Sequence, residues 1–221
     1  MLAFPGEMVS KEVLLRIYEE LYKKFGPQGW WPAETPFEVI VGAVLTQNTA
    51  WGNVERALRN LKGGGALSPQ RIAEMQQREL QELIRPAGYF RVKAERLKAV
   101  VEFLLEEFEG SVEKMASKPL EELRPKLLRV KGIGPETADS ILLYACEKPI
   151  FVVDAYTRRA LGRHGLVRDG APYEEIQSIF MEALPKDVEL FKEYHALLVK
   201  LGKTHCRPKA RCEGCPLKGM L

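Results

Sequence analysis

Apolar residues recur every three or four positions along most of this chain, and this spacing marks one buried face of an amphipathic helix. The pattern predicts helices over residues 11–25, 36–45, 51–61, 92–108, 120–130, 136–145, 172–184 and 188–201. Two shorter helices are predicted after Ser68-Pro69 and at residues 80–84, and glycine and proline turns separate the elements. A strand-like apolar run occurs only at residues 150–153. The pattern therefore predicts an all-α fold of short helices.

The stretch from Leu127 to Asp154 contains a turn of unusual composition. One helical pattern ends at Val130, and a second begins at Pro135, whose fixed φ suits the first position of a helix. Between them lie Lys131, Gly132, Ile133 and Gly134. Glycine takes positive φ without a steric penalty, so we expect a tight turn in which Ile133 packs the two helices together. Backbone N–H groups at such a helix start can bind a phosphate, although an ordinary helical hairpin would show the same glycine pattern.

A single carboxylate follows this hairpin. Asp154 comes after the apolar run and directly before a helical pattern at residues 155–161. Together they resemble the helix-hairpin-helix, Gly/Pro-rich loop and aspartate motif of the endonuclease III superfamily of DNA glycosylases. The resemblance implies a two-lobed all-α fold, with a central lobe at residues 30–148 and a second lobe at 1–29 and 149–221. It also implies that Asp154 lies in the cleft between the lobes, that the protein is a monomer, and that it binds double-stranded DNA containing a damaged base.

Asp154 is the predicted catalytic residue. A DNA glycosylase breaks the bond between the base and C1′ of the sugar through a transition state with oxocarbenium character. A fixed carboxylate can stabilise that positive charge or orient the attacking water. The alternative role is structural, because an aspartate at this position also caps the helix that follows it.

The residue at position 136 bears on the type of reaction. In superfamily members that also cleave the DNA backbone, a lysine at this position of the motif forms a Schiff base with the sugar. The sequence here reads Gly132-Ile133-Gly134-Pro135-Glu136-Thr137-Ala138. A carboxylate cannot form an imine, so we expect a monofunctional enzyme that releases the base and leaves an abasic site.

Tryptophans flank the predicted helix at residues 36–45. Trp30, Trp31 and Pro32 precede it and Trp51 follows it. This segment resembles the 3-methyladenine branch of the superfamily, in which tryptophan, proline and a further aromatic residue line the base pocket; Lys203 is a further candidate for contact with the base. An alkylated purine is cationic, and a flipped cationic base stacks favourably on a π face. The alternative is that these tryptophans are core residues.

The resemblance also assigns DNA contacts. Gln47 lies where family members insert a side chain into the gap left by a flipped nucleotide, although an amide there could equally cap a helix. Tyr89 lies in the loop that elsewhere supplies a second wedge. Within the hairpin, the predicted DNA-binding residues are Lys131, Gly132, Ile133, Gly134 and Thr137.

Composition and charge favour the same class of protein. The chain of 221 residues is 46% hydrophobic and 29% charged, as is usual for soluble globular proteins. We find neither an apolar run of about 18 residues nor the pattern of a secretory signal peptide, so we expect a cytoplasmic protein without a membrane partner. The net charge of +3 is small, but basic residues gather near the C-terminus, which is typical of a nucleic-acid-binding face.

The cysteines are concentrated in the same C-terminal tail. The spacing Cys206-x5-Cys212-x2-Cys215 resembles the iron–sulfur motif of the superfamily, in which a fourth cysteine follows. That fourth position is Leu221, and the first gap is one residue short of the usual pattern. We expect Cys206, Cys212 and Cys215 to bind a [4Fe–4S] cluster, with His205, water or Cys146 as the fourth ligand and with zinc or no metal as alternatives. Such a loop would present Arg207, Lys209 and Arg211 to phosphates.

These features predict a monofunctional DNA glycosylase of base excision repair that flips and excises an alkylated purine such as 3-methyladenine. One alternative is an enzyme of the same fold that acts on mismatched adenine, mismatched thymine or an oxidised pyrimidine. The other is a non-catalytic protein that binds DNA structures.

Overall fold

The computed structural model describes residues 9–220, and all regular elements within this range are helices, which confirms the all-α prediction. The chain divides into two compact units. The central unit is Trp31–Lys148, and the terminal unit combines Met1–Trp30 with Pro149–Leu221, of which residues 9–30 and 149–220 are described. In this described part of the chain, no helix combines the length and the apolar composition that crossing a membrane requires.

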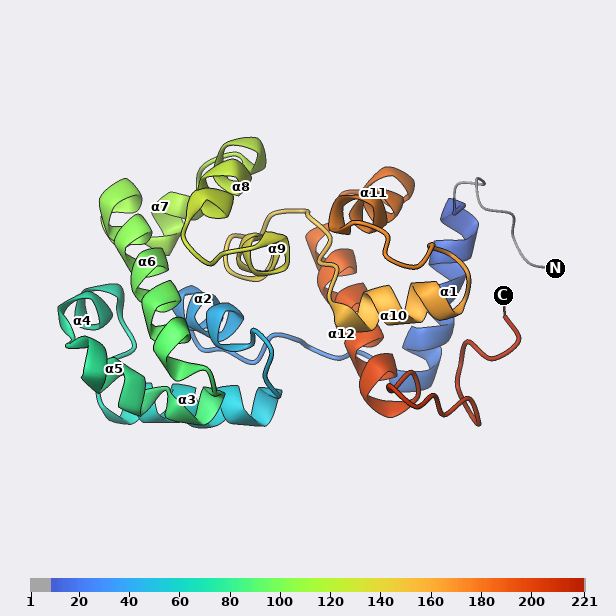
Figure 1. Ribbon diagram of the computed structural model, residues 1–221. Coiled ribbons are helices and arrows are strands. Elements are labelled where there is room, and N and C mark those ends of the chain that lie inside the picture. The colour runs from blue at the N-terminus through green and yellow to red at the C-terminus, as the bar shows by residue number, and fades with distance from the viewer. Residues whose placement is uncertain (1–8, 221) are drawn as a thin grey trace. The chain divides into compact units, whose positions relative to one another are not determined.

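The central unit is built around helix α2 (Pro36–Leu45), in which every residue after Pro36 is buried. The other helices of this unit are α3 (Trp51–Gly63), α4 (Pro69–Glu74), α5 (Gln77–Leu83), η1 (Arg85–Ala87), α6 (Phe90–Phe108), α7 (Val112–Ala116), α8 (Leu120–Arg129) and α9 (Pro135–Tyr144). Helices α3, α6 and α9 contact α2, whose apolar sequence suits burial on all sides (Figure 1). The loop that follows α2 therefore begins at a rigid, buried helix end.

The terminal unit brings together both ends of the chain. It contains α1 (Lys11–Phe25), α10 (Ala155–Arg163), α11 (Tyr173–Ala183) and α12 (Val188–Thr204). Helix α12 packs against α1 and α10 (Figure 1). A buried hydrogen bond from Tyr194 Oη to the carbonyl of Leu14, 2.9 Å long, joins α12 to α1. Helix α12 is thus the element on which the start of α10 is supported.

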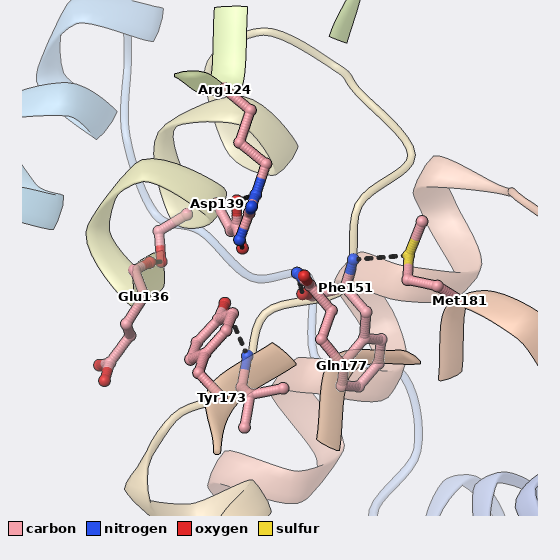
Figure 2. Close-up of polar contacts among 9 residues, drawn as sticks. Arg124, Glu136, Asp139, Phe151, Tyr173, Gln177 and Met181 are labelled. Carbon is pink, nitrogen blue, oxygen red and sulfur yellow. Dashed lines mark hydrogen bonds and ion pairs between the residues drawn. The ribbon is translucent and has the colours of Figure 1, made fainter. Parts of the chain in front are cut away.

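The strand-like run at residues 150–153 is extended but forms no strand. Its side chains are buried, and the ring of Phe151 stacks on that of Phe180 with 3.7 Å between centroids. Side chains of α11 pair with its backbone: Gln177 donates to the carbonyl of Phe151 at 2.6 Å, and the Phe151 N–H donates to Met181 Sδ at 3.3 Å (Figure 2). Because the backbone groups of Phe151 are satisfied by these side chains, this residue can be buried without a partner strand.

Candidate functional site

Asp154 lies at the N-terminus of α10, in the terminal unit. Its Oδ1 accepts a hydrogen bond from the Thr157 N–H at 2.7 Å, which makes it the N-cap of the helix. Its Oδ2 lies 3.6 Å from His195 Nε2 on α12, and the Asp154 side chain is 12% exposed. Burial raises the pKa of the Asp154 carboxyl, but the hydrogen bonds and charge of His195 and the Thr157 N–H lower it more, so the net pKa is below its ordinary value. The carboxylate is therefore ionised at neutral pH.

His195 is a site residue that the sequence analysis missed. It lies on the buried side of α12, and no pattern near it in the sequence points to Asp154. The two residues meet only because α10 packs against α12. Their contact supplies Asp154 with a second anchor, beside its capping bond.

The hairpin between α8 and α9 has one left-handed residue. Gly132 has a φ of 82°, while Gly134 has a φ of −92° and serves as the N-cap of α9, so the expected use of positive φ applies to Gly132 alone. Ile133 is buried, as a residue that packs the two helices together should be. Gly134 has no side chain with which to cap α9, so the first N–H groups of this helix are suited to bind an anion.

Polar side chains on this hairpin serve different purposes. Thr137 is buried and faces the protein interior. Lys131 is exposed, and its Nζ forms an ion pair with Glu95 Oε2 at 3.6 Å. Glu136 is exposed, and its carboxylate points away from Asp139 (Figure 2). Asp139 receives two bonds from Arg124, at 2.8 and 3.1 Å, and this ion pair joins α9 to α8. Thr137 is therefore placed to organise the hairpin from inside, and Lys131 is the cationic side chain on its surface.

Gln47, two residues beyond α2, is bound to the hairpin. Its Nε2 donates to Thr137 Oγ1 at 2.9 Å and to the carbonyl of Gly132 at 3.2 Å, and its Oε1 accepts from Arg96. A Cβ added at Gly132 would lie only 2.4 Å from Arg96 Cγ, so the glycine also makes room for this arginine. The loop after α2 and the glycine turn thus form one connected polar group.

The aromatic residues fall into two sets. In the central unit, the ring of Trp31 lies 5.3 Å from that of Trp51, edge to face, and 5.2 Å from that of Tyr144. Gly42 lies beneath Trp31, since a Cβ there would be 3.2 Å from the indole. We refer to Trp31, Trp51 and Tyr144 as the aromatic group. Tyr144 was not predicted, because α9 brings it to the tryptophans from far along the chain.

The second set lies in the terminal unit. Lys203 Nζ is 5.4 Å from the centre of the Trp30 ring, a cation–π contact. The unit boundary separates Trp30 from Trp31, so residue 30 belongs to the terminal unit and not to the predicted central lobe. Pro32 is exposed in the central unit, and Tyr89 is an exposed residue directly before α6. The predicted pocket residues are therefore not all on one unit.

In the described part of the cysteine tail, the structure does not show the predicted metal site. Cys206 is buried, Cys212 is exposed and Cys215 is intermediate. Among residues 9–220, no group of three or more His, Cys, Asp and Glu side chains lies close enough to hold a metal ion. Burial raises the pKa of the Cys146 thiol to about 12, and Leu221 lies outside the described residues. A [4Fe–4S] cluster at Cys206, Cys212 and Cys215 therefore stays a prediction.

Arginines of α10 hold the cysteine tail. Arg159 Nε donates to the carbonyl of Cys206 at 2.6 Å, and Arg163 donates to the Sγ of Cys206 at 3.3 Å and to the carbonyl of Pro208 at 2.6 Å. The basic side chains on this tail are exposed: Arg207, Lys209 and Arg211. The tail therefore presents positive charge from a backbone that is anchored to α10.

A family model and several known proteins assign the chain to the same family. The family model of HhH-GPD superfamily base excision DNA repair proteins matches residues 41–186. A protein of Methanocaldococcus jannaschii named as a DNA repair glycosylase is 51% identical over 209 residues, which are 94% of each chain. Endonuclease III of Thermotoga maritima is 33% identical over 184 residues, covering 83% of this chain and 81% of that one.

A solved structure is also similar over most of its length. It is the H. pylori 3-methyladenine DNA glycosylase bound to 1,N6-ethenoadenine, which superposes with a TM-score of 0.76 at 31% identity. The match covers 88% of this chain and 98% of that one. The residues that the family model matches, 41–186, contain both the hairpin and the aspartate described above.

Proposed function

The chain is a DNA glycosylase that belongs to the HhH-GPD superfamily of base excision DNA repair proteins, and we propose that it removes an alkylated purine from duplex DNA by hydrolysis alone. The observation that carries this proposal is the anchored carboxylate of Asp154, which is ionised at neutral pH and directly follows the hairpin.

Asp154 is the proposed catalytic residue. Departure of the base leaves positive charge on the sugar, and a preorganised carboxylate stabilises that charge without having to reorient. The Thr157 N–H and His195 hold the carboxylate in place, and together they keep its pKa low. An ionised group of low basicity suits charge stabilisation and the orientation of water better than it suits donation of a proton.

The aromatic group is the proposed site of base recognition. The ring of Trp31 lies close to those of both Trp51 and Tyr144, and aromatic rings of this kind can bind the face of an extruded base. An alkylated purine carries a positive charge that a π face attracts, and its charge also makes it a good leaving group. The relative whose structure contains ethenoadenine supports a modified purine as the substrate. In the terminal unit, Lys203 and Trp30 are a second proposed contact with the nucleotide.

Contacts with the DNA backbone are proposed for the hairpin and the tail. The N–H groups at the start of α9 would bind a phosphate, with Lys131 beside them, and Arg207, Lys209 and Arg211 would add positive charge. Gln47 and Tyr89 would enter the duplex where the nucleotide leaves it. Gln47 would then exchange its bonds to Thr137 and Gly132 for contacts with DNA.

The test is a set of matched duplexes, each with one lesion: 3-methyladenine analogues, ethenoadenine, adenine opposite oxidised guanine, thymine or uracil opposite guanine, and oxidised pyrimidine. We expect release of the alkylated or etheno purine and an intact strand until the abasic site is cleaved by alkali. Release of only a mismatched or oxidised base would replace the proposed substrate. Binding without release from any duplex would support the non-catalytic alternative.

The monofunctional reaction has a separate test. Glu136 occupies the position of a Schiff-base lysine and is exposed, so no amine is supplied there. Treatment with borohydride during turnover should give no covalent protein–DNA adduct, while a bifunctional glycosylase run in parallel should give one. An adduct with this chain would overturn the monofunctional assignment.

A further inference from the structure

A buried lysine on α6 has no part in the site described above. Lys93 is only 1% exposed, and its Nζ donates to two backbone carbonyls, those of Leu45 and Ala87, at 2.8 Å each. Burial, with a further contribution from the positive charge of Arg96, lowers the pKa of Lys93 to about 8. Burying an ammonium group is unfavourable because the charge loses its hydration. An apolar side chain would fill the same space with a smaller loss of free energy.

The two carbonyls belong to the ends of two elements that carry predicted DNA contacts. Leu45 is the last residue of α2, and Gln47 follows two positions later; Ala87 is the last residue of η1, and Tyr89 follows two positions later. Lys93 therefore binds a carbonyl in each loop at the same relative position, two residues before the side chain that is proposed to enter DNA.

The same loops are close together and have strained backbones at their tips. Thr49 Oγ1 lies 4.0 Å from the position of a Cβ added at Gly88, so one loop borders the other. Asn48 and Tyr89 have φ values of 51° and 45°, in the left-handed region that non-glycine residues seldom adopt. Tyr89 is also 74% exposed. Strained and exposed tips keep one conformation only if the residues beneath them are held firmly.

We propose that Lys93 is a positioning residue that fixes the loops of Gln47 and Tyr89 relative to each other, so that both side chains enter the duplex in register. Hydrogen bonds from a charged donor are stronger than neutral ones, and this explains why an ammonium group occupies the buried site beneath the two loops. Lys93 touches neither base nor sugar, and its effect is exerted on extrusion of the nucleotide. The inference rests on the proposed function, because only an enzyme that extrudes a nucleotide needs wedges.

The experiment compares Lys93→Met with Lys98→Met. Lys98 is a matched control on the same helix: its Nζ also donates to two backbone carbonyls, those of Ala73 and Met75, but that loop has no predicted DNA contact. Single-turnover excision is measured for one lesion in two duplexes, opposite a normal base and opposite an abasic analogue, where extrusion is easier. Thermal unfolding followed by circular dichroism reports on folding.

For Lys93→Met we expect the rate on the paired duplex to fall on the order of tenfold to a hundredfold, as loss of one or two such bonds implies. The rate on the abasic-opposed duplex should stay within about threefold, so the ratio of the two rates changes, and Lys98→Met should leave that ratio unchanged. An equal loss on both duplexes, or the same change in Lys98→Met, would overturn the positioning role. If Lys93→Met does not fold, Lys93→Gln, which retains two N–H donors, should give an intermediate ratio. A wild-type protein inactive on both duplexes would overturn the proposed function itself.

Discussion

Two aspartates, one in each unit, differ in the partners that hold them. Asp139, in the central unit, is fully buried, and both of its oxygens accept from the guanidinium of Arg124 (Figure 2). Asp154, in the terminal unit, has a backbone N–H on one oxygen and, at 3.6 Å, the imidazole of His195 near the other. The two carboxylates differ in burial, since the Asp154 side chain is 12% exposed, and in the geometry of their partners.

The difference fits a structural role for Asp139 and the proposed catalytic role for Asp154. A bidentate guanidinium matches the carboxylate of Asp139 in charge and in shape, so that group joins α8 to α9 and is not directed at a ligand. The bonds to Asp154 orient its carboxylate and keep it ionised, and a more distant imidazole offsets its charge less than a bidentate ion pair would. A partly exposed carboxylate of this kind can respond to positive charge that develops on a substrate.

Asp154→Asn should have the largest effect. Asparagine is an equally good N-cap, so the bond from the Thr157 N–H and the folding of α10 should persist while the negative charge is lost. We expect the single-turnover rate of base release to fall about 10²- to 10⁴-fold. The binding constant for the lesion duplex and the melting temperature should change little. A rate close to that of the wild type would mean that Asp154 is only a cap.

Asp139→Asn should show the opposite behaviour. The substitution leaves the guanidinium of Arg124, which is partly exposed, without its matching charge in a largely buried position. We expect the free energy of unfolding to fall by about 3 kcal/mol, measured by urea denaturation, with excision per folded molecule nearly unchanged. If this variant were stable but inactive, the contrast between the two aspartates would fail.

Much of the fold could be predicted because helical periodicity is a local property. The expected helix at residues 136–145 is observed as α9, Pro135–Tyr144, and the turn before it follows from Gly132. The run at residues 150–153 shows the limit of such patterns. Its composition is that of a strand, but whether its backbone pairs with another strand or with side chains of α11 depends on contacts between distant segments.

The candidate site could be predicted only where its parts are close in sequence. Asp154 was identifiable from its place before α10, but His195 and Tyr144 join their partners through helix packing that no spacing reveals. Trp30 and Trp31 are neighbours in sequence, but the unit boundary falls between them, and no local pattern marks it. The spacing of the cysteines predicted candidate metal ligands, but whether they bind a metal depends on contacts that spacing does not fix.

A more conservative substitution tests what stabilises the ion pair of Arg124 and Asp139. Arg124→Lys keeps the positive charge beside Asp139 but replaces a planar fork, which donates from two nitrogens, by a single ammonium group. We expect a loss of about 1 kcal/mol in the free energy of unfolding, smaller than that of Asp139→Asn. The measurement is the same urea titration. A loss as large as that of Asp139→Asn would show that shape and not charge dominates the pair.

The smallest effect is expected at His195, and it concerns pH. The pKa of Asp154 is lowered in the folded protein, so the ionised form is present above that pKa and is lost as the pH falls through it. His195→Asn keeps a hydrogen-bond donor but removes a group that can carry positive charge, so the pKa of Asp154 should rise. The loss of kcat/KM in acid should then begin at higher pH than in the wild type, by less than about one pH unit. The profile is followed from neutral pH to below 3.8, the ordinary value from which the pKa of Asp154 is lowered. His164→Asn, a histidine of the same unit at the end of α10, is the matched control and should leave the profile in place. An unchanged acid limb in His195→Asn would mean that the imidazole only fills space beside Asp154, and that Thr157 keeps the carboxylate ionised without it.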